Sequence, residues 1–170
     1  QDIIWHKPNP MPESVKDRCT KSHEYIFLLS KSANYYFDHK AISEKSIWAE
    51  TDKRAITGPT QSKKSKDGPY QCKQQGVYNS DGLKNKRDVW SVCTKAEKEN
   101  HFAVFPDTLI VDCIKAGCPG NGVVLDPFMG SGTTAVVARK LNRNYIGFEL
   151  NPKFVEISER KLRNELGMWL

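Results

Sequence analysis

Apolar and polar residues follow regular spacings in the last third of the chain. Residues 123–125 and 145–148 are short apolar runs with the length of buried strands. Between them, residues 133–141 carry apolar side chains at helical spacing. An Asn-Pro pair at 151–152 supplies a typical cap and first residue for an amphipathic helix over residues 153–166. Strand, helix and strand with short connections predict a parallel strand pair with a right-handed crossover.

The N-terminal region has shorter apolar runs. Asp2–His6 predicts a strand, and residues 7–12, which contain three prolines, are predicted to be irregular. Residues 23–31 (HEYIFLLSK) are rich in aromatic and branched side chains and predict a buried strand. Residues 34–38 are predicted to be its antiparallel neighbour across a polar turn.

The middle of the chain has little periodicity. From 44 to about 87, Lys, Ser, Gln, Gly and Asp dominate. A loop of this length inside a compact domain is usually functional or disordered. Regular structure is expected again over residues 86–92. Residues 101–116 predict a loop followed by a helix, with Pro106 in its first turn and Gly117 at its end.

Composition narrows the class of protein. The chain has 170 residues and a net charge of +6, which favours a polyanionic partner. Its five cysteines form no C-x-x-C pair, so we expect reduced thiols and no metal site. No apolar run has the roughly 20 residues that a membrane span needs. The sequence begins with Gln, and we expect it to start inside a longer reading frame.

The loop after the first of the parallel strands predicts a ligand site. Gly130 and Gly132 allow a sharp turn and a close approach of the ligand. The N–H groups at the start of the following helix favour an anionic group, and Thr133 and Thr134 add hydroxyl donors. Glu149, at the end of the next strand, could accept both hydroxyls of a ribose. The expected ligand therefore has a ribose and an anionic end.

Three ligands meet this description. A nucleoside triphosphate on a P-loop is disfavoured because Thr133, and not Lys, follows Gly132. NAD fits because GSGTTA satisfies G-x-G-x-x-A, with Glu149 at nearly the expected spacing. S-adenosylmethionine fits as well, with a carboxylate in place of the pyrophosphate. The glycine pattern alone does not separate the last two.

The string DPFMGSGTT, residues 126–134, resembles the S-adenosylmethionine-binding loop of the amino-methylating (N6-adenine/N4-cytosine) DNA methyltransferases. It is similar to the group with permuted motif order, in which this loop follows the target-recognition region. The resemblance continues through YIGFELNP, HFAVFP, GLKNKRDVW and IIWHKPNPMPESVKDRCTKSHEYIFLLSKS, and thus covers most of the chain outside residues 44–81. It implies an α/β, Rossmann-like methyltransferase fold with a mostly parallel sheet and an antiparallel hairpin, incomplete at the N-terminus.

The resemblance also implies which residues bind S-adenosylmethionine. The loop would wrap the methionine part, the two threonines would meet its carboxylate, Glu149 would bind the ribose, and the two residues after Glu149 would flank the adenine. The matching positions are Asp126, Phe128, Gly130, Ser131, Gly132, Thr133, Thr134, Glu149, Leu150 and Asn151, with His101, Phe102, Ala103 and Pro106 on a second segment.

Three regions follow from the same resemblance. Residues 1–43 would form the target-base side of the core, 44–86 a basic target-recognition insert, and 87–170 the cofactor-binding half. DNA contacts are expected from basic side chains on the first two regions and at the start of the third. These are Lys7, Lys53, Arg54, Lys63, Lys64, Lys84, Lys86 and Arg87.

One family motif has no match. The family holds the target amino group with a tetrapeptide of the D/N/S-P-P-Y/F/W type, and none stands before IIWHK. The nearest string, DGPY at 67–70, indicates a turn. We therefore expect the catalytic residues, which are unknown here, to precede Gln1. This chain alone is then expected to bind cofactor weakly and not to methylate.

Together these features predict a site-specific DNA methyltransferase from the cytoplasm of a bacterium or archaeon, or one encoded by a phage. Its expected partner is double-stranded DNA, a restriction endonuclease is a candidate partner, and monomer and homodimer both stay open. Two alternatives remain, an NAD-dependent oxidoreductase and a non-catalytic DNA-binding remnant of a methyltransferase.

Overall fold

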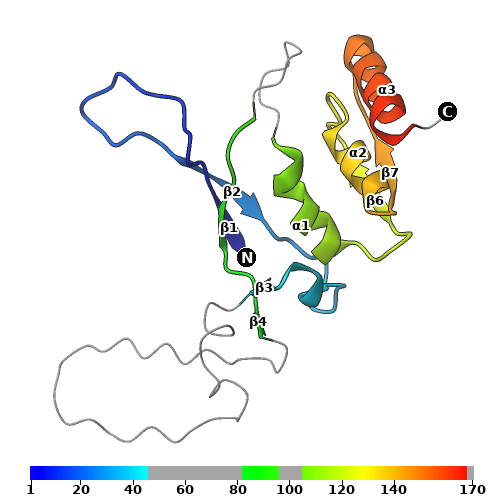
Figure 1. The fold of residues 1–170 in the computed structure, drawn as a ribbon, viewed down its shortest axis with the longest axis horizontal. Helices are drawn as coiled ribbons and strands as arrows, with labels where there is room; N and C mark the ends of the chain where they lie inside the picture. Colours follow the sequence, from blue (N-terminus) through cyan, green and yellow to red (C-terminus); the bar gives the residue numbers. More distant parts are fainter. Residues whose placement is uncertain (46–81, 96–104, 168–170) are drawn as a thin grey trace, which may run out of the picture. The chain divides into compact units, whose positions relative to one another are not determined.

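The computed structural model describes residues 1–45, 82–95 and 105–167 (Figure 1). The chain forms two compact units. One consists of Gln1–Ala41 and Arg87–Leu170, and the other of Ile42–Lys86. The candidate site lies in the first unit.

A three-stranded sheet begins the first unit. It contains β1 (Asp2–His6), β2 (His23–Phe27) and β5 (Val89–Ser91) in the order β2-β1-β5. β2 is antiparallel to β1, and β5 is parallel to it, with Trp5 opposite Trp90. The predicted strand over Asp2–His6 is confirmed, and so is the absence of regular structure over residues 7–12.

The prediction for residues 23–38 is wrong in three respects. The strand ends at Phe27, and it pairs with β1 and not with residues 34–38, which are irregular. It is also not buried, since Tyr25 is 51% and Phe27 65% exposed. The apolar run suggested burial on both faces, but among the described residues β2 is an edge strand, paired with β1 alone.

Helix α1 (Asp107–Gly117) covers the other face of this sheet. Leu109 packs there against Trp5 and Trp90. Both indoles are buried, and each donates its N–H to a backbone carbonyl, as burial of a polar group requires. The predicted helix is confirmed and ends at Gly117, but Pro106 occupies the N-cap, just before the first turn.

The second part of this unit is the predicted strand-helix-strand-helix. It runs β6 (Val123–Asp126), α2 (Thr133–Lys140), β7 (Asn144–Gly147) and α3 (Pro152–Leu166). β6 and β7 are parallel, as predicted. Asn151 caps α3 by accepting a hydrogen bond from the Lys153 N–H, which confirms the predicted start of that helix.

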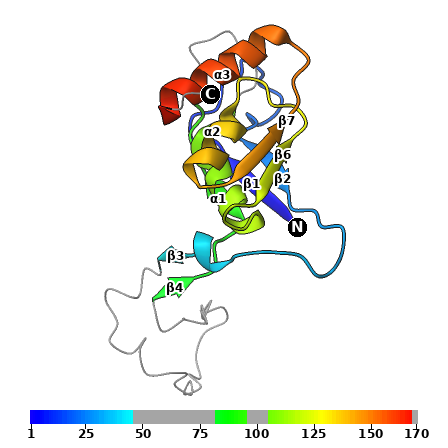
Figure 2. The ribbon, with the colours of Figure 1, turned by 90° about the vertical axis from the view of Figure 1, so that its right-hand side faces the viewer.

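Helix α2 is packed on several sides. It lies beside α1, α3 and the β6–β7 pair (Figures 1 and 2). Val137 and Ala138 pack against Ile114 of α1, whereas Ala135 and Val136 pack against Leu162 of α3. The small side chains of α2 allow this close approach. At its surface end, Lys140 pairs with Glu165 at 2.5 Å and lowers the pKa of that carboxyl group.

The second unit is described only at its ends. β3 (Glu44–Lys45) pairs antiparallel with β4 (Leu83–Lys84), and a short 3-10 helix, η1 (Lys40–Ile42), precedes β3. The basic stretch over residues 46–81 lies outside the described residues. In the parts of the chain that the structure describes, no helix has the length and apolar character needed to cross a membrane.

The core assignment predicts a difference between two leucines. Leu109→Ala removes a buried side chain between two tryptophans and should lower the free energy of unfolding by about 2–4 kcal/mol. Leu29→Ala is the matched control, because Leu29 is 84% exposed, and it should change that free energy by less than about 0.5 kcal/mol. Urea unfolding followed by tryptophan fluorescence measures both values. Equal effects would contradict the assignment of Leu109 to the core.

Candidate functional site

The loop that leaves β6 is shaped by Asp126. One oxygen of this carboxylate accepts the Phe128 N–H at 2.9 Å, which closes a tight turn. The other accepts the Thr134 hydroxyl at 2.6 Å. A single side chain therefore fixes the beginning of the loop and the first turn of the helix that follows it.

Two glycines let the loop reach α2. Gly130 and Gly132 have φ values of 54° and 85°, in the left-handed region that favours glycine. At Gly132 a side chain would also collide with α3, since an added Cβ would lie 2.6 Å from the Cβ of Ser158. The glycine is thus required by both the backbone conformation and the approach of α3.

Glu149 holds the loop from the adjacent strand. Its Oε2 accepts the Gly130 N–H at 2.9 Å, and its Oε1 accepts the Asn151 N–H at 2.8 Å. The backbone continues this connection, because the Met129 N–H donates to the Phe148 carbonyl. Glu149 thus joins the loop to the start of the segment that leads into α3.

The N-terminus of α2 faces the same loop. Its N-cap is Gly132, and no side chain caps it. The first N–H groups of a helix have no partner within the helix, and they attract an anion. The hydroxyl of Thr134 is used by Asp126, so Thr133 is the better placed of the two predicted hydroxyl donors.

Apolar side chains project beside these polar groups. Phe128 is 88% exposed and Leu150 is fully exposed. Both lie just beyond the carboxyl ends of the parallel strands β6 and β7, the edge at which open α/β sheets bind ligands. The loop therefore combines a fixed carboxylate, an open helix N-terminus and exposed apolar side chains.

The structure brings together most of the predicted cofactor residues. The ten that lie on the loop and after β7 are Asp126, Phe128, Gly130, Ser131, Gly132, Thr133, Thr134, Glu149, Leu150 and Asn151. Pro106 is buried at the start of α1. His101, Phe102 and Ala103 lie outside the described residues.

One residue at this loop was not predicted. Lys161 of α3 donates a hydrogen bond from Nζ to Ser131 Oγ at 3.0 Å. It stands three positions after Ser158, on the face of α3 that approaches Gly132. The amphipathic pattern of α3 predicted a buried face, but only the fold shows which loop that face meets.

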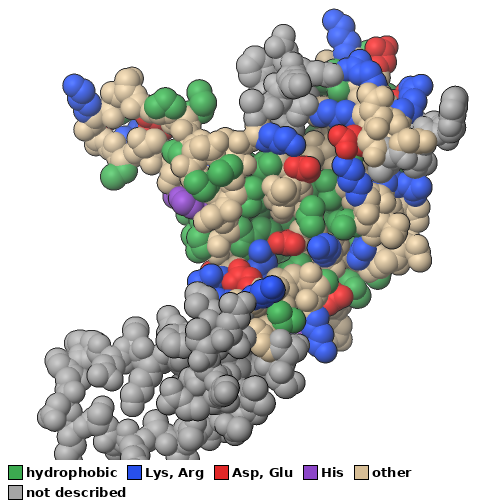
Figure 3. Space-filling view, in the orientation of Figure 1, with side chains coloured by type: hydrophobic (Ala, Val, Ile, Leu, Met, Phe, Trp, Pro, Cys, Tyr) green, Lys and Arg blue, Asp and Glu red, His purple; other side chains and the backbone are tan. Residues whose placement is uncertain are grey.

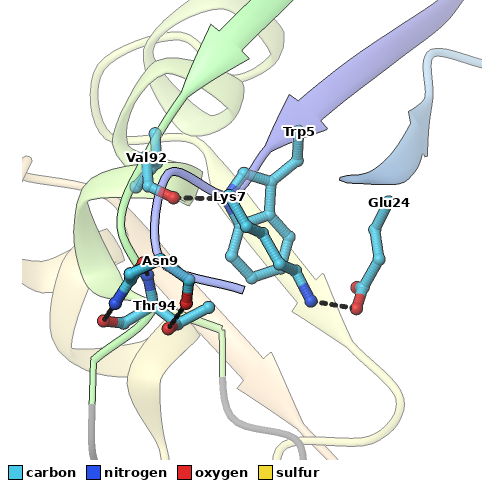
Figure 4. Close-up of polar contacts among 6 residues, drawn as sticks. All are labelled: Trp5, Lys7, Asn9, Glu24, Val92 and Thr94. Carbon is cyan, nitrogen blue, oxygen red and sulfur yellow. Dashed lines mark hydrogen bonds and ion pairs between the residues drawn. The ribbon is translucent and has the colours of Figure 1, made fainter. Parts of the chain in front are cut away.

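A second polar cluster lies at the carboxyl ends of β1 and β5 (Figure 4). The Asn9 side-chain amide donates to the Thr94 carbonyl at 3.1 Å and accepts the Thr94 N–H at 2.8 Å. It thus makes the two hydrogen bonds that the backbone of a neighbouring strand would make. The Trp5 indole donates to the Val92 carbonyl beside it. These bonds attach the proline-rich segment to the chain that follows β5.

The predicted DNA-contact residue Lys7 belongs to the same cluster. Its Nζ lies 4.5 Å from the centre of the Trp5 ring and forms an ion pair with Glu24 (Figure 4). The side chain is largely buried, with 19% exposed. A phosphate would therefore have to compete with Glu24 for this ammonium group.

The other predicted DNA contacts are distributed. Lys84 is 3.6 Å from Glu44 within the second unit, and Arg87 is exposed in the first. Lys86 is half-buried. Lys53, Arg54, Lys63 and Lys64 lie outside the described residues. On the face shown in Figure 3, blue Lys and Arg side chains lie over several elements and form no single patch.

No metal site is found in the described ranges. Among their His, Cys, Asp and Glu side chains, no group of three or more is placed to hold an ion.

Fold and site together define an α/β domain with a candidate ligand site at the carboxyl ends of two parallel strands. A family model described as DNA methylase, for N6 and N4 methyltransferases, matches residues 1–160. The chain belongs to this family.

Two relatives show the extent of the similarity. The chain is 42% identical over 164 residues to the Type II methyltransferase M.Cfr9I of Citrobacter freundii, covering 96% of this chain and 44% of that protein. It is 40% identical over 161 residues to the Type II methyltransferase M.SmaI of Serratia marcescens, and the match covers 95% of this chain and 45% of that protein. The chain thus spans less than half the length of these relatives.

Solved structures support the fold. The cytosine-N4-specific PvuII DNA methyltransferase has a TM-score of 0.62 at 17% identity, covering 98% of this chain and 55% of that one. The M1.HpyAVI–SAM complex has a TM-score of 0.55 at 23% identity, and the match covers 95% of this chain and 60% of that one. The predicted fold class is confirmed.

The geometry predicts the effect of removing one acceptor from the loop. Glu149→Gln replaces a carboxylate oxygen with an amide that points its own N–H at a backbone N–H. It should lower the free energy of unfolding by about 1–3 kcal/mol in urea unfolding. Glu156→Gln is the control, because Glu156 is exposed on α3, and it should have an effect below about 0.5 kcal/mol. If the two variants are equally stable, Glu149 does not hold the loop.

Proposed function

We propose that this protein is a site-specific DNA methyltransferase. It transfers a methyl group from S-adenosylmethionine to the exocyclic amino group of adenine (N6) or cytosine (N4) in double-stranded DNA. The observation that carries the proposal is the Glu149 carboxylate, which is held beside the Gly130 N–H at the carboxyl ends of β6 and β7. Membership of the DNA methylase family supports the same function.

The residues present fit the cofactor. Glu149 offers a fixed carboxylate for the two ribose hydroxyls, and the first turn of α2, with Thr133, offers donors for the methionine carboxylate. The exposed side chains of Phe128 and Leu150 offer apolar surface to the adenine and to the sulfur-bearing chain. When bound, S-adenosylmethionine supplies an activated methyl group.

The described residues contribute binding and positioning. Asp126 and Glu149 fix the loop through backbone N–H groups, so the site is formed before the ligand arrives. Holding two reactants close together and correctly oriented can supply a large part of the rate enhancement of a displacement reaction. The target amino group is engaged inside the duplex, so the base has to be extruded to react.

The residues that receive the base are not assigned. The DGPY string at 67–70, which the sequence indicates to be a turn, lies outside the described residues. The names of the relatives, Type II methyltransferases, support DNA as the substrate. From those names we also propose a restriction endonuclease with the same target site as a partner in the cell.

Cofactor choice is the first test. In isothermal titration calorimetry, S-adenosylhomocysteine should bind and NAD should not. Glu149→Gln should weaken binding of S-adenosylhomocysteine by about tenfold or more, which corresponds to about 1.4 kcal/mol. Glu156→Gln should leave it unchanged. Tight binding of NAD with none of S-adenosylhomocysteine would refute the proposal in favour of an oxidoreductase.

Methyl transfer is the second test. The full-length protein is incubated with duplex DNA and tritiated S-adenosylmethionine, and the DNA is digested to nucleosides. Label should appear in N6-methyladenine or in N4-methylcytosine, but not in both, because an enzyme specific for one target site presents one kind of base to the methyl group. Transfer should fall as salt is raised, since phosphate contacts release counterions. Label in neither nucleoside, while cofactor still binds, would indicate the non-catalytic remnant.

A further inference from the structure

A lysine on the face of α3 that packs against the candidate cofactor loop contacts a serine of that loop. Lys161 Nζ donates to the hydroxyl oxygen of Ser131, at 3.0 Å. Ser131 is 3% exposed and stands between the two glycines of the loop. Lys161 itself is half-buried.

Packing of α3 fixes the position of this lysine. Gly132 has no side chain, which lets the backbone of the loop approach Ser158. Leu162, next to Lys161, is buried against Ala135 and Val136 of α2. Lys161 is therefore held on the face of α3 that meets the loop, one helical turn after Ser158.

The direction of the hydrogen bond determines what Ser131 can do. An ammonium group has donors only, so the serine oxygen accepts and its own proton remains available to another acceptor. Within the described residues, the contact with Lys161 is the hydrogen bond found for this hydroxyl, and there Ser131 is the acceptor. A hydroxyl that accepts from a cation is also a stronger donor. It stands next to the uncapped start of α2.

We propose that Lys161 is a positioning residue for the anionic end of the cofactor. Lys161 orients and polarises the Ser131 hydroxyl, which donates to the carboxylate of the methionine part. The inference rests on the proposed function and extends it by one residue, because Lys161 acts through Ser131 and needs no contact with the cofactor. It should therefore affect ligands that carry the carboxylate and not those that lack it.

The test compares two ligands on four single variants and on the double variant that combines Lys161→Met with Ser131→Ala. S-adenosylhomocysteine carries the carboxylate, whereas 5′-methylthioadenosine keeps the adenosine and the thioether but lacks the amino-acid end. The variants are Lys161→Met, Lys161→Arg, Ser131→Ala and, as a control, Lys153→Met. Lys153 is exposed on the same helix, and its replacement by Met removes the same charge.

The expected result is selective. Lys161→Met and Ser131→Ala should each weaken S-adenosylhomocysteine binding by about tenfold, the size of one hydrogen bond to a charged group. Binding of 5′-methylthioadenosine should change by less than about twofold. Lys161→Arg should restore most of the affinity, and Lys153→Met should leave both ligands unaffected. The double variant should lose little more than either single one, because the two residues act as a unit.

Two results would overturn the inference. Equal weakening of both ligands by Lys161→Met would show that the lysine only tethers α3 to the loop. Additive losses in the double variant would show that the two residues act separately. Ser131→Ala gives the same comparison from the loop side if Lys161→Met folds poorly, and thermal unfolding checks this. Failure of the proposed function is seen separately, because the unmodified protein would then bind neither ligand.

Discussion

The packing of α2 is the constraint on which the rest of the first unit depends. Val137 and Ala138 contact α1, Ala135 and Val136 contact α3, and the β6–β7 pair lies alongside. Interiors are packed closely enough that adding even one methylene group is felt. A larger residue at Ala138, which is completely buried, would separate α1 from α2. The same packing aims the N-terminus of α2 at the loop, so core and site share one element.

Two carboxylates that accept backbone N–H groups hold the loop of the candidate site. Asp126 connects the loop to α2, and Glu149 connects it to the end of β7. Each therefore has a structural task that precedes any ligand. A fixed carboxylate can accept hydrogen bonds from ribose hydroxyls, whereas an open helix N-terminus attracts an anion. The two groups would therefore bind opposite ends of one ligand.

Sequence predicted the local features well and the non-local ones poorly. The order β6, α2, β7, α3 follows from short-range signals such as the Asn-Pro cap and the glycine turn. The partner of β2 did not follow, because pairing with β1 depends on residues about twenty positions away, while the nearby YYF run offered a false neighbour. The ten candidate cofactor residues lie on two local motifs, so the sequence could predict that they lie together. Lys161 could not, since its contact with Ser131 spans 30 positions and depends on how α3 crosses the loop.

The predicted DNA contacts can be ranked by how firmly each cation is already held. Lys84 pairs with Glu44 at 3.6 Å, a long contact between side chains that are 28% and 25% exposed. This ion pair is the contact found for its ammonium group among the described residues. Lys7 differs, because its stem is largely buried and its ammonium group lies over the Trp5 ring as well as beside Glu24. Moving it would forfeit a cation–π contact worth about 0.5–2 kcal/mol in addition to the pair. Lys7 is therefore better explained as part of the structure that joins β1 to β2, and Lys84 retains a role in phosphate binding more easily.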